Sequence, residues 1–408
     1  MELSIRVQFP AVAPDGFLVV SIRRMKPARL RIFSAVSVTL FVGLTIFFLL
    51  WRDDAEGVVE ACRSSPQTLK DKCYENLMTK ALVTRGLPAA LELVGESSTN
   101  DAWFGGNCHL TMHAVGKYAY DQYSKGSPLD MTKKVSYCNY GFFHGFMEEM
   151  AAQTGSVAQA KKFCDFVGEQ LKEDSAMKSN CYHGIGHGVV DGYDSRVWGD
   201  AITMTAPGLK LCHEVTTDDE LLRSCEMGAF NSLELMYPDS KYRLDFGDDP
   251  YVLCRKPVYD DNEKKACYTE MSVLVTTDFA RGDFSKALGY IRNVEPAYRL
   301  YTVRYIAIYS VPQVSSGNPV DLLDACRTLG TAYESACVIG LTQGSLAYGA
   351  PGKRYQRAID FCRQVSLTVS ERKLCVHTIV FSDTSSDAER NAVCRVLPKD
   401  MRTEDCKV

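Results

Sequence analysis

The chain has 408 residues, of which 24% are charged and 46% are hydrophobic, the balance of a folded protein rather than a disordered one. Its 46 Lys and Arg residues against 50 Asp and Glu residues give a net charge of -4, which predicts no nucleic-acid partner. The 16 cysteines are the unusual part of the composition. An even number of this size is typical of a disulfide framework formed in an oxidising compartment.

One segment near the N-terminus is long and apolar enough to cross a bilayer. Residues 32–51 carry no charged side chain over 20 positions, basic residues precede them, and acidic residues follow them. The positive-inside rule therefore predicts a cytoplasmic tail at 1–31, a transmembrane signal-anchor at 32–51 and a body at 52–408 in the periplasm or extracellular space. A cleaved signal peptide is the alternative, and Met25 is an alternative start that would give a short basic tail.

The cysteines fall into two kinds that alternate along the chain. One kind ends an apolar helical phrase, and after 11 to 17 residues the other kind opens the next phrase. This order predicts that a bridge ties the end of each helix to the start of the next, although other connectivities remain open. The expected pairs are Cys62–Cys73, Cys164–Cys181, Cys212–Cys225, Cys254–Cys267, Cys326–Cys337, Cys362–Cys375 and Cys394–Cys406, and the two left over, Cys108 and Cys138, are expected to pair with each other.

The spacing of the helix-ending cysteines indicates an internal repeat. Cys254, Cys326 and Cys362 are 72 and 36 residues apart, so the longer gap fits two units. The middle of this 72-residue gap, residues 283–310, is predicted to form two helices that lack cysteines. Helical phrases dominate elsewhere, and no alternating series with hairpin turns accompanies the short β-branched runs. We therefore predict an all-α body of disulfide-stapled helical repeats, either an α-solenoid or a closed α/α toroid.

Five of the seven histidines lie in three successive cysteine-opened segments, within repeats that cover about residues 100–240. Residues four apart share one face of a helix. The first segment carries His109 and His113, the second pairs His144 with Glu148, and the third carries His183 and His187. Three neighbouring helices are thus expected to present two candidate ligands each.

This pattern predicts a metal site, because imidazole and carboxylate groups on facing helices suit zinc, iron or copper. The predicted ligands are His109, His113, His144, His183 and His187, and the predicted catalytic residues are Glu148 and Glu149, as groups that orient a ligand or act on bound water. Non-covalent haem is the alternative cofactor. The histidine segments lack the glutamate of H-E-x-x-H metalloproteases and the C-x-x-C-H of covalently attached haem.

Two classes of function remain open at this point. The first is a membrane-anchored extracytoplasmic metalloprotein, with a hydrolase or oxidoreductase as its enzymatic form. The second is a metal-free scaffold whose groove binds a peptide or protein and whose histidines are structural. The glycines around the histidines cost helix propensity, which either close helix approach or room for a ligand would explain. His213 and His377 stand outside the three segments, and we interpret both as structural.

Overall fold

The computed structural model describes residues 59–172, 176–190, 195–314, 318–349, 354–382 and 387–402, together with Cys406. The chain divides into two units, residues 1–64 and 65–408, and the second unit holds nearly all of the described residues. The predicted tail at 1–31 and the predicted anchor at 32–51 lie outside the described residues. Among the helices that are described, none combines the length and apolar character needed to cross a membrane.

The second unit is all-α, and no strand occurs in the described ranges. Its first helices are α2 (Gln67–Arg85), α3 (Leu87–Asn100), α4 (Ala102–Asn107), α5 (His109–Ser124), α6 (Gly141–Thr154), α7 (Val157–Gln170), α8 (Ala176–Val190), α9 (Ala201–Val215) and α10 (Asp219–Met236). They are followed by α11 (Asp261–Leu274), α12 (Phe284–Gly289), α13 (Arg299–Ser310), α14 (Leu323–Arg327), α15 (Thr331–Ala347), α16 (Arg354–Cys362), α17 (Val369–Phe381) and α18 (Asp387–Val396). Short 3₁₀ turns span Lys133–Ser136, Ser240–Tyr242, Pro250–Val252, Tyr290–Asn293, Pro296–Tyr298, Val311–Gln313, Pro319–Leu322 and Lys399–Met401, and a π-helical turn spans Val275–Phe279.

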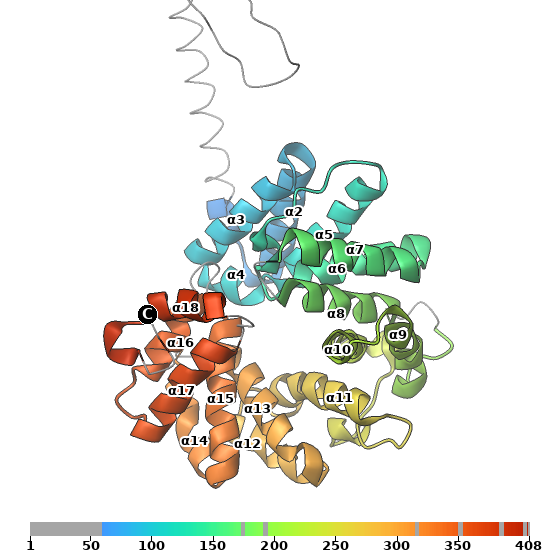
Figure 1. Ribbon diagram of the computed structural model, residues 1–408. Coiled ribbons are helices and arrows are strands. Elements are labelled where there is room, and N and C mark those ends of the chain that lie inside the picture. Colours follow the sequence, from blue (N-terminus) through green and yellow to red (C-terminus); the bar gives the residue numbers. More distant parts are fainter. Residues whose placement is uncertain are drawn as a thin grey trace, which may run out of the picture. The chain divides into compact units, whose positions relative to one another are not determined.

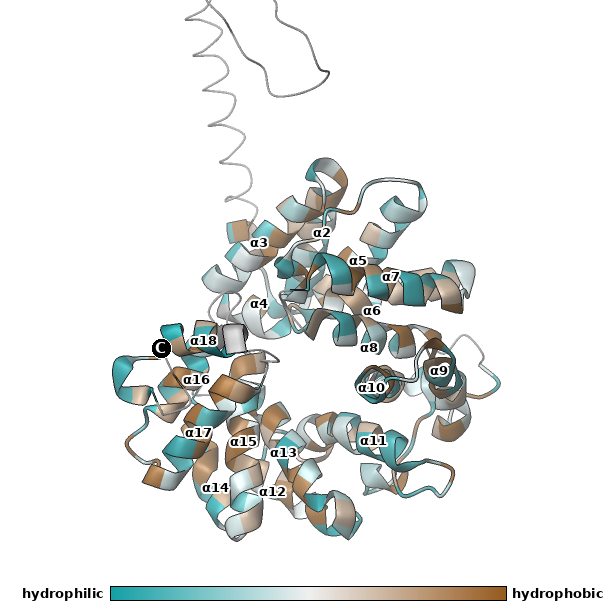
Figure 2. Cartoon of the chain, in the orientation of Figure 1, coloured by the Kyte–Doolittle hydropathy of each residue, from teal (hydrophilic) through white to brown (hydrophobic). Residues whose placement is uncertain are grey.

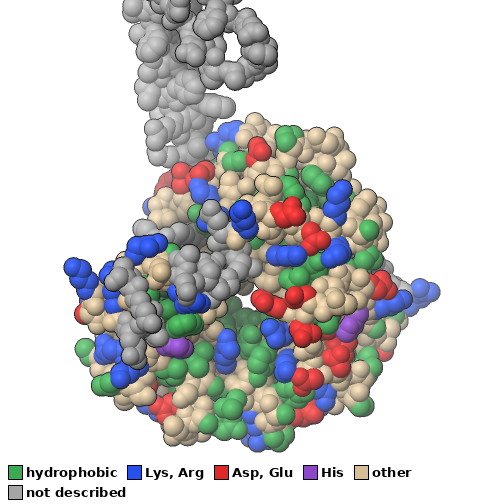
Figure 3. All heavy atoms as spheres, in the orientation of Figure 1, with side chains coloured by type: hydrophobic (Ala, Val, Ile, Leu, Met, Phe, Trp, Pro, Cys, Tyr) green, Lys and Arg blue, Asp and Glu red, His purple; other side chains and the backbone are tan. Residues whose placement is uncertain are grey.

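One set of helices packs in succession, each against the next. This series runs α2, α5, α6, α8, α10, α11, α13, α15 and α17, and it follows an arc through the second unit (Figure 1). The other helices connect members of the series and pack along their flanks. Each helix carries hydrophobic and hydrophilic stretches (Figure 2), as expected of helices that bury one face. The face drawn in Figure 3 is hollowed near its centre, with acidic side chains gathered along one rim.

The sequence starts many of these helices with side-chain caps. Ser156, Asp200 and Asp218 each accept a hydrogen bond from a backbone N–H in the first turn of α7, α9 and α10. Asp260 and Thr368 go further, because each forms a reciprocal capping box with a glutamate three residues later. Each cap determines the residue at which a connecting segment ends and a helix begins. The length of each repeat therefore follows from the local sequence.

The disulfides confirm the pairing expected from the two kinds of cysteine. The structure contains the bridges Cys108–Cys138, Cys164–Cys181, Cys212–Cys225, Cys254–Cys267, Cys326–Cys337, Cys362–Cys375 and Cys394–Cys406. Cys62 and Cys73 are also in disulfide form. Apart from the bridges Cys108–Cys138 and Cys394–Cys406, these pairs join a flanking helix or turn to the next member of the series. The segment between Cys267 and Cys326 forms α12 and α13 without a cysteine, as expected.

The glycines of the histidine segments let neighbouring helices touch backbone to backbone. A Cβ atom on Gly145 of α6 would lie 1.8 Å from the carbonyl oxygen of His113 on α5. A Cβ on Gly186 of α8 would lie 1.8 Å from the carbonyl oxygen of Cys225, and one on Gly228 of α10 would meet that of His183 at the same distance. Close helix approach therefore explains these glycines, and their cost in helix propensity is offset by packing.

Candidate metal centre

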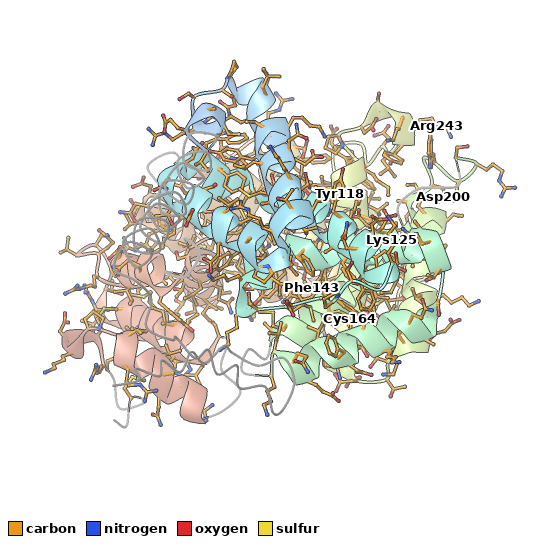
Figure 4. The ribbon with its side chains drawn as sticks, turned by 90° about the horizontal axis from the view of Figure 1, so that it is seen from above. Tyr118, Lys125, Phe143, Cys164, Asp200 and Arg243 are labelled. Atoms are coloured by element: carbon orange, nitrogen blue, oxygen red, sulfur yellow. A yellow bond between two sulfur atoms is a disulfide. The ribbon has the colours of Figure 1, made fainter. Side chains whose placement is uncertain are left out.

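Three adjacent helices bring the five predicted histidines into one cluster. His109 and His113 lie along α5, His144 lies on α6, and His183 and His187 lie on α8. Neighbouring rings have their centroids 4.8 to 5.4 Å apart, and the rings of His183 and His187 both stack on that of His144. Figure 4 shows this part of the unit from above, with Tyr118 on α5, Lys125 directly after the end of α5, Phe143 on α6 and Cys164 on α7.

Three of the five histidines point ring nitrogens at a common point. His113 Nε2 lies 3.2 Å from His109 Nε2 and 3.1 Å from His144 Nδ1. Nitrogen ligands of a tetrahedral zinc ion, at about 2.0–2.1 Å from the metal, are about 3.3 Å from one another. The observed separations are within a few tenths of an ångström of that value. His109, His113 and His144 therefore form a group that could hold a metal ion.

Glu148 holds one of these rings from behind. Its Oε1 accepts a hydrogen bond from His113 Nδ1 at 3.0 Å and lies 3.0 Å from His187 Nδ1, and its Oε2 is 2.6 Å from Lys117 Nζ. The carboxylate and both histidines are buried, whereas the Lys117 side chain is 44% exposed. A carboxylate that fixes the outer nitrogen of a histidine is the usual companion of a metal ligand.

The protons in this group can be placed from its neighbours. The carbonyl oxygen of Cys138 only accepts, so the His109 Nδ1 that lies 2.9 Å from it carries a proton. The Glu148 carboxylate likewise requires a proton on His113 Nδ1. The Nε2 atoms of His109 and His113 then carry no proton, and their lone pairs face each other at 3.2 Å. His144 Nδ1 can donate a hydrogen bond to His113 Nε2, but no proton is then left between His113 Nε2 and His109 Nε2.

A left-handed turn aims the Cys138 carbonyl at His109. Cys138, Asn139 and Tyr140 have φ of 57°, 55° and 60°, immediately before α6 begins at Gly141. This conformation costs roughly 1–2 kcal/mol for each residue that is not glycine. Three such residues in a row persist only where the surroundings over-determine them, and strain of this kind clusters at functional sites. Here the Cys108–Cys138 bridge anchors one end of the turn and α6 the other.

His183 connects the cluster to a polar group that the sequence analysis did not single out. Its neighbour Asn231 of α10 donates from Nδ2 to Glu234 at 3.2 Å and to Glu270 of α11 at 3.1 Å. Burial and the charge of Asp278 raise the pKa of Glu234 to about 8, and burial beside Glu234 raises the pKa of Glu270 well above its usual value. The pair therefore holds at least one proton at neutral pH. The sequence indicates Asn231 only by its position, because it aligns with His144 and His187 six residues after a helix-opening cysteine.

Glu149, predicted beside Glu148 as a catalytic group, is not part of the cluster. Its carboxylate accepts a hydrogen bond from Gln153 one turn along α6, at 2.8 Å. Adjacent residues on a helix point about 100° apart, so only one of two neighbouring glutamates can face α5. A cavity of about 340 Å³ between α6 and α9 also lies apart from the cluster, because Met147, Ile185 and Pro207 are among its lining residues and none of the five histidines is.

Burial shifts the pKa values of four histidines of the cluster downward. Burial, then the charges of neighbouring histidines, lower the pKa of His109 and that of His183 to about 3, and they lower those of His113 and His144 as well. Burial opposes ionisation of Glu148, but its contacts with His113 and His187 outweigh this effect and hold its pKa below the usual range. The rings of His109, His113, His144 and His183 are therefore neutral and the Glu148 carboxylate is ionised at neutral pH, the states that metal binding requires.

The metal-free protein is expected to lose stability as the pH falls below 6.5. Between pH 6.5 and about 3 the unfolded chain protonates His109 and His183 while the folded chain does not. The free energy of unfolding should then fall by about 1.4 kcal/mol per pH unit for each such histidine. Urea titrations of EDTA-treated protein at pH 7 and pH 5 measure this slope. A His183→Gln variant should show a shallower slope, and an unchanged one would contradict the expectation.

Comparisons with protein-family models, with curated proteins and with solved structures found no match to this chain. The functional conclusion therefore rests on the chain itself. Its disulfides indicate an oxidising, extracytoplasmic compartment, and its buried His and Glu groups could hold a metal ion.

Proposed function

We propose that this protein is an extracytoplasmic metalloprotein that binds one divalent transition-metal ion through His109 Nε2, His113 Nε2 and His144 Nδ1. The observation that supports this most directly is that two nitrogens, His109 Nε2 and His144 Nδ1, lie within 3.2 Å of His113 Nε2. Hydrogen bonding alone leaves two lone pairs in opposition there, whereas a cation at the common point would satisfy both. Burial makes the alternative, an imidazolium ring, unfavourable.

The ligand set favours a bare ion over haem. Three imidazoles suit zinc, copper or iron, and three histidines with one remaining position are a composition found in catalytic zinc sites. Two histidines on opposite faces of a haem iron would have their nitrogens about 4 Å apart with the macrocycle between them. Nitrogens 3.1 to 3.2 Å apart leave no room for that plane.

The chain's own groups would orient the ligands and serve the remaining position. Glu148 and the Cys138 carbonyl hold the outer nitrogens of His113 and His109, which fixes both the tautomer and the ring plane. His109 and Lys117 are partly exposed, so they mark the approach from solvent. A zinc-type ion held there would supply Lewis-acid chemistry to the group in its fourth position. We therefore favour a hydrolytic or hydration reaction over electron transfer.

The same proposal includes the finer features of the architecture. We infer a single-pass anchor at residues 32–51 that holds the repeats outside the membrane, from the charge pattern that flanks this segment. An open α-solenoid and a closed α/α toroid both bend a series of packed helices along an arc, so the arc of the second unit is compatible with either form of the predicted repeat. The competing function, a metal-free scaffold for peptide or protein ligands, predicts that histidine substitutions leave metal content unchanged.

Metal content of the purified full chain tests the proposal. We expect close to one equivalent of zinc, copper or iron at this site after expression in an oxidising host and dialysis. His144→Gln should lower the affinity by more than 100-fold, because removing a ligand costs more than the 10–100-fold typical of its supporting groups. Glutamine is a mild replacement, since Gln343 occupies the equivalent repeat position. Glu148→Gln should lower the affinity by about 10–100-fold.

The matched control is the same kind of substitution at a histidine outside the cluster. His377→Gln on α17 should leave metal content unchanged. If His144→Gln binds as many metal equivalents as the unmodified chain, or if the unmodified chain binds none of the three metals, the metalloprotein proposal fails and the scaffold function is preferred.

A further inference from the structure

A second group of metal-binding side chains lies away from the histidine cluster. His213 is at the end of α9, Glu226 is in α10, and Glu263 is in the first turn of α11. Nε2 of His213 is 3.6 Å from Glu226 Oε1 and 3.7 Å from Glu263 Oε1. The three residues come from two successive repeats, and only His213 is substantially exposed, at 46% of its side chain.

Glu226 is the feature that sequence and packing do not explain. Its side chain is fully buried, and neither of its carboxylate oxygens has a hydrogen-bond partner. A buried carboxylate without partners carries a penalty of several kcal/mol. Such a group persists when it is paired, protonated or bound to a cation.

The surroundings of Glu226 add further negative charge. Burial is the largest cause that raises the pKa of Glu226, and the negative charges of Asp260 and Glu263 add to it. The positive charge of Arg223 opposes this shift only in part, so the pKa is raised to about 8. Glu263 already uses Oε2 to accept the backbone N–H of Asp260 in the capping box. Its Oε1 is therefore the atom left to face His213 and Glu226.

We propose that His213, Glu226 and Glu263 form a second site for a divalent cation of the zinc or manganese type, independent of the His109–His113–His144 centre. One imidazole and two carboxylates suit these ions better than calcium, which prefers oxygen ligands throughout. The present N···O separations exceed the tetrahedral edge expected for zinc by only a few tenths of an ångström, so small side-chain rotations complete the site.

An ion in this position would have a structural role. His213 follows Cys212 and Glu226 follows Cys225, and these two cysteines form a disulfide, so α9 and α10 are already joined there. Glu263 belongs to the next repeat. The ion would therefore add the connection from α10 to α11 that the Cys212–Cys225 bridge does not supply, and metal should stabilise the protein against unfolding.

Counting metal ions in matched variants of the full chain tests this proposal. Tag-free protein is stripped with EDTA, loaded with zinc chloride or manganese chloride, passed over a desalting column and analysed for metal. We expect two zinc equivalents in the unmodified chain, one in Glu226→Gln, one in His144→Gln and none in the double variant. His213→Ala should also lose one equivalent, and because this side chain is half-exposed, its removal should leave the fold intact.

Glu220→Gln is the control, because Glu220 is an exposed glutamate in the first turn of the same helix. It should bind as much zinc as the unmodified chain. The proposal is overturned if Glu226→Gln and His213→Ala both keep the full zinc content, which would mean that Glu226 is simply protonated, since glutamine resembles a protonated carboxyl group. If the histidine centre proves not to bind metal, the unmodified chain would show one equivalent that Glu226→Gln still removes, so the two proposals fail separately.

Discussion

Replacing Gly145 by alanine is expected to destabilise the protein by about 3 kcal/mol or more and to abolish metal binding at the histidine centre. The added Cβ would lie 1.8 Å from the carbonyl oxygen of His113 and 2.5 Å from its carbonyl carbon. These are backbone atoms, so no side-chain rotation relieves the overlap and α5 must move away from α6. Overpacking of this kind costs 1–3 kcal/mol where side chains can adjust, and more where they cannot.

The movement of α5 would act on the site as well as on stability. His109 and His113 lie on α5 and His144 lies on α6, one residue before Gly145, so their nitrogens would separate. Denaturant unfolding and metal analysis of Gly145→Ala measure both effects. Gly106→Ala is the control, because a Cβ on Gly106 would meet nothing within 4 Å. Equal stability of the two variants would show that the helices tolerate a wider separation.

Removal of the Cys108–Cys138 bridge should give the second large effect. This bridge closes a loop of 30 residues, longer than those of the other six bridges described above, and the chain-entropy model assigns it about 3.6 kcal/mol. The Cys394–Cys406 bridge closes 12 residues and should be worth about 2.8 kcal/mol. Paired Cys→Ser substitutions of each bridge, compared by denaturant unfolding, should reproduce this order.

The two bridges should differ more clearly in their effect on metal. Cys138 supplies the carbonyl oxygen that accepts from His109 Nδ1, and its bridge anchors the left-handed turn before α6. Without the bridge we expect metal affinity to fall by about 10–100-fold, the range seen when a supporting group is lost. The Cys394→Ser/Cys406→Ser variant should keep its affinity. Equal metal affinities in the two variants would show that the Cys108–Cys138 bridge does not support the metal site.

The helices and the bridges could be predicted because their determinants are local. Caps such as Asp260 with Glu263 start a helix within one turn, and the cysteine spacing fixed which helix end could reach which helix start. The same reasoning placed His109 with His113 and His144 with Glu148, since four residues bring a side chain back to the same face. The bridge pairs confirmed by the structure depend on no long-range information beyond the repeat itself.

The composition of the site depended on contacts between helices. Glu148 and Glu149 are adjacent in the sequence and both were predicted as catalytic residues, but the rotation of α6 turns only Glu148 toward His113. Asn231 and Glu234 lie on α10 and Glu270 lies on α11, so the contact among them depends on how these two helices pack. Glu226 was likewise unremarkable until its burial was known.

The sequence by itself determined an all-α, disulfide-stapled repeat body and the helices that carry histidines, because spacing and capping act within a few residues. Only the tertiary structure decided which nitrogens converge and which carboxylates lose water. The physical reason is the backbone contact at Gly145, Gly186 and Gly228, which sets how near the helices come. A change of an ångström there would leave every helix intact and separate His109, His113 and His144.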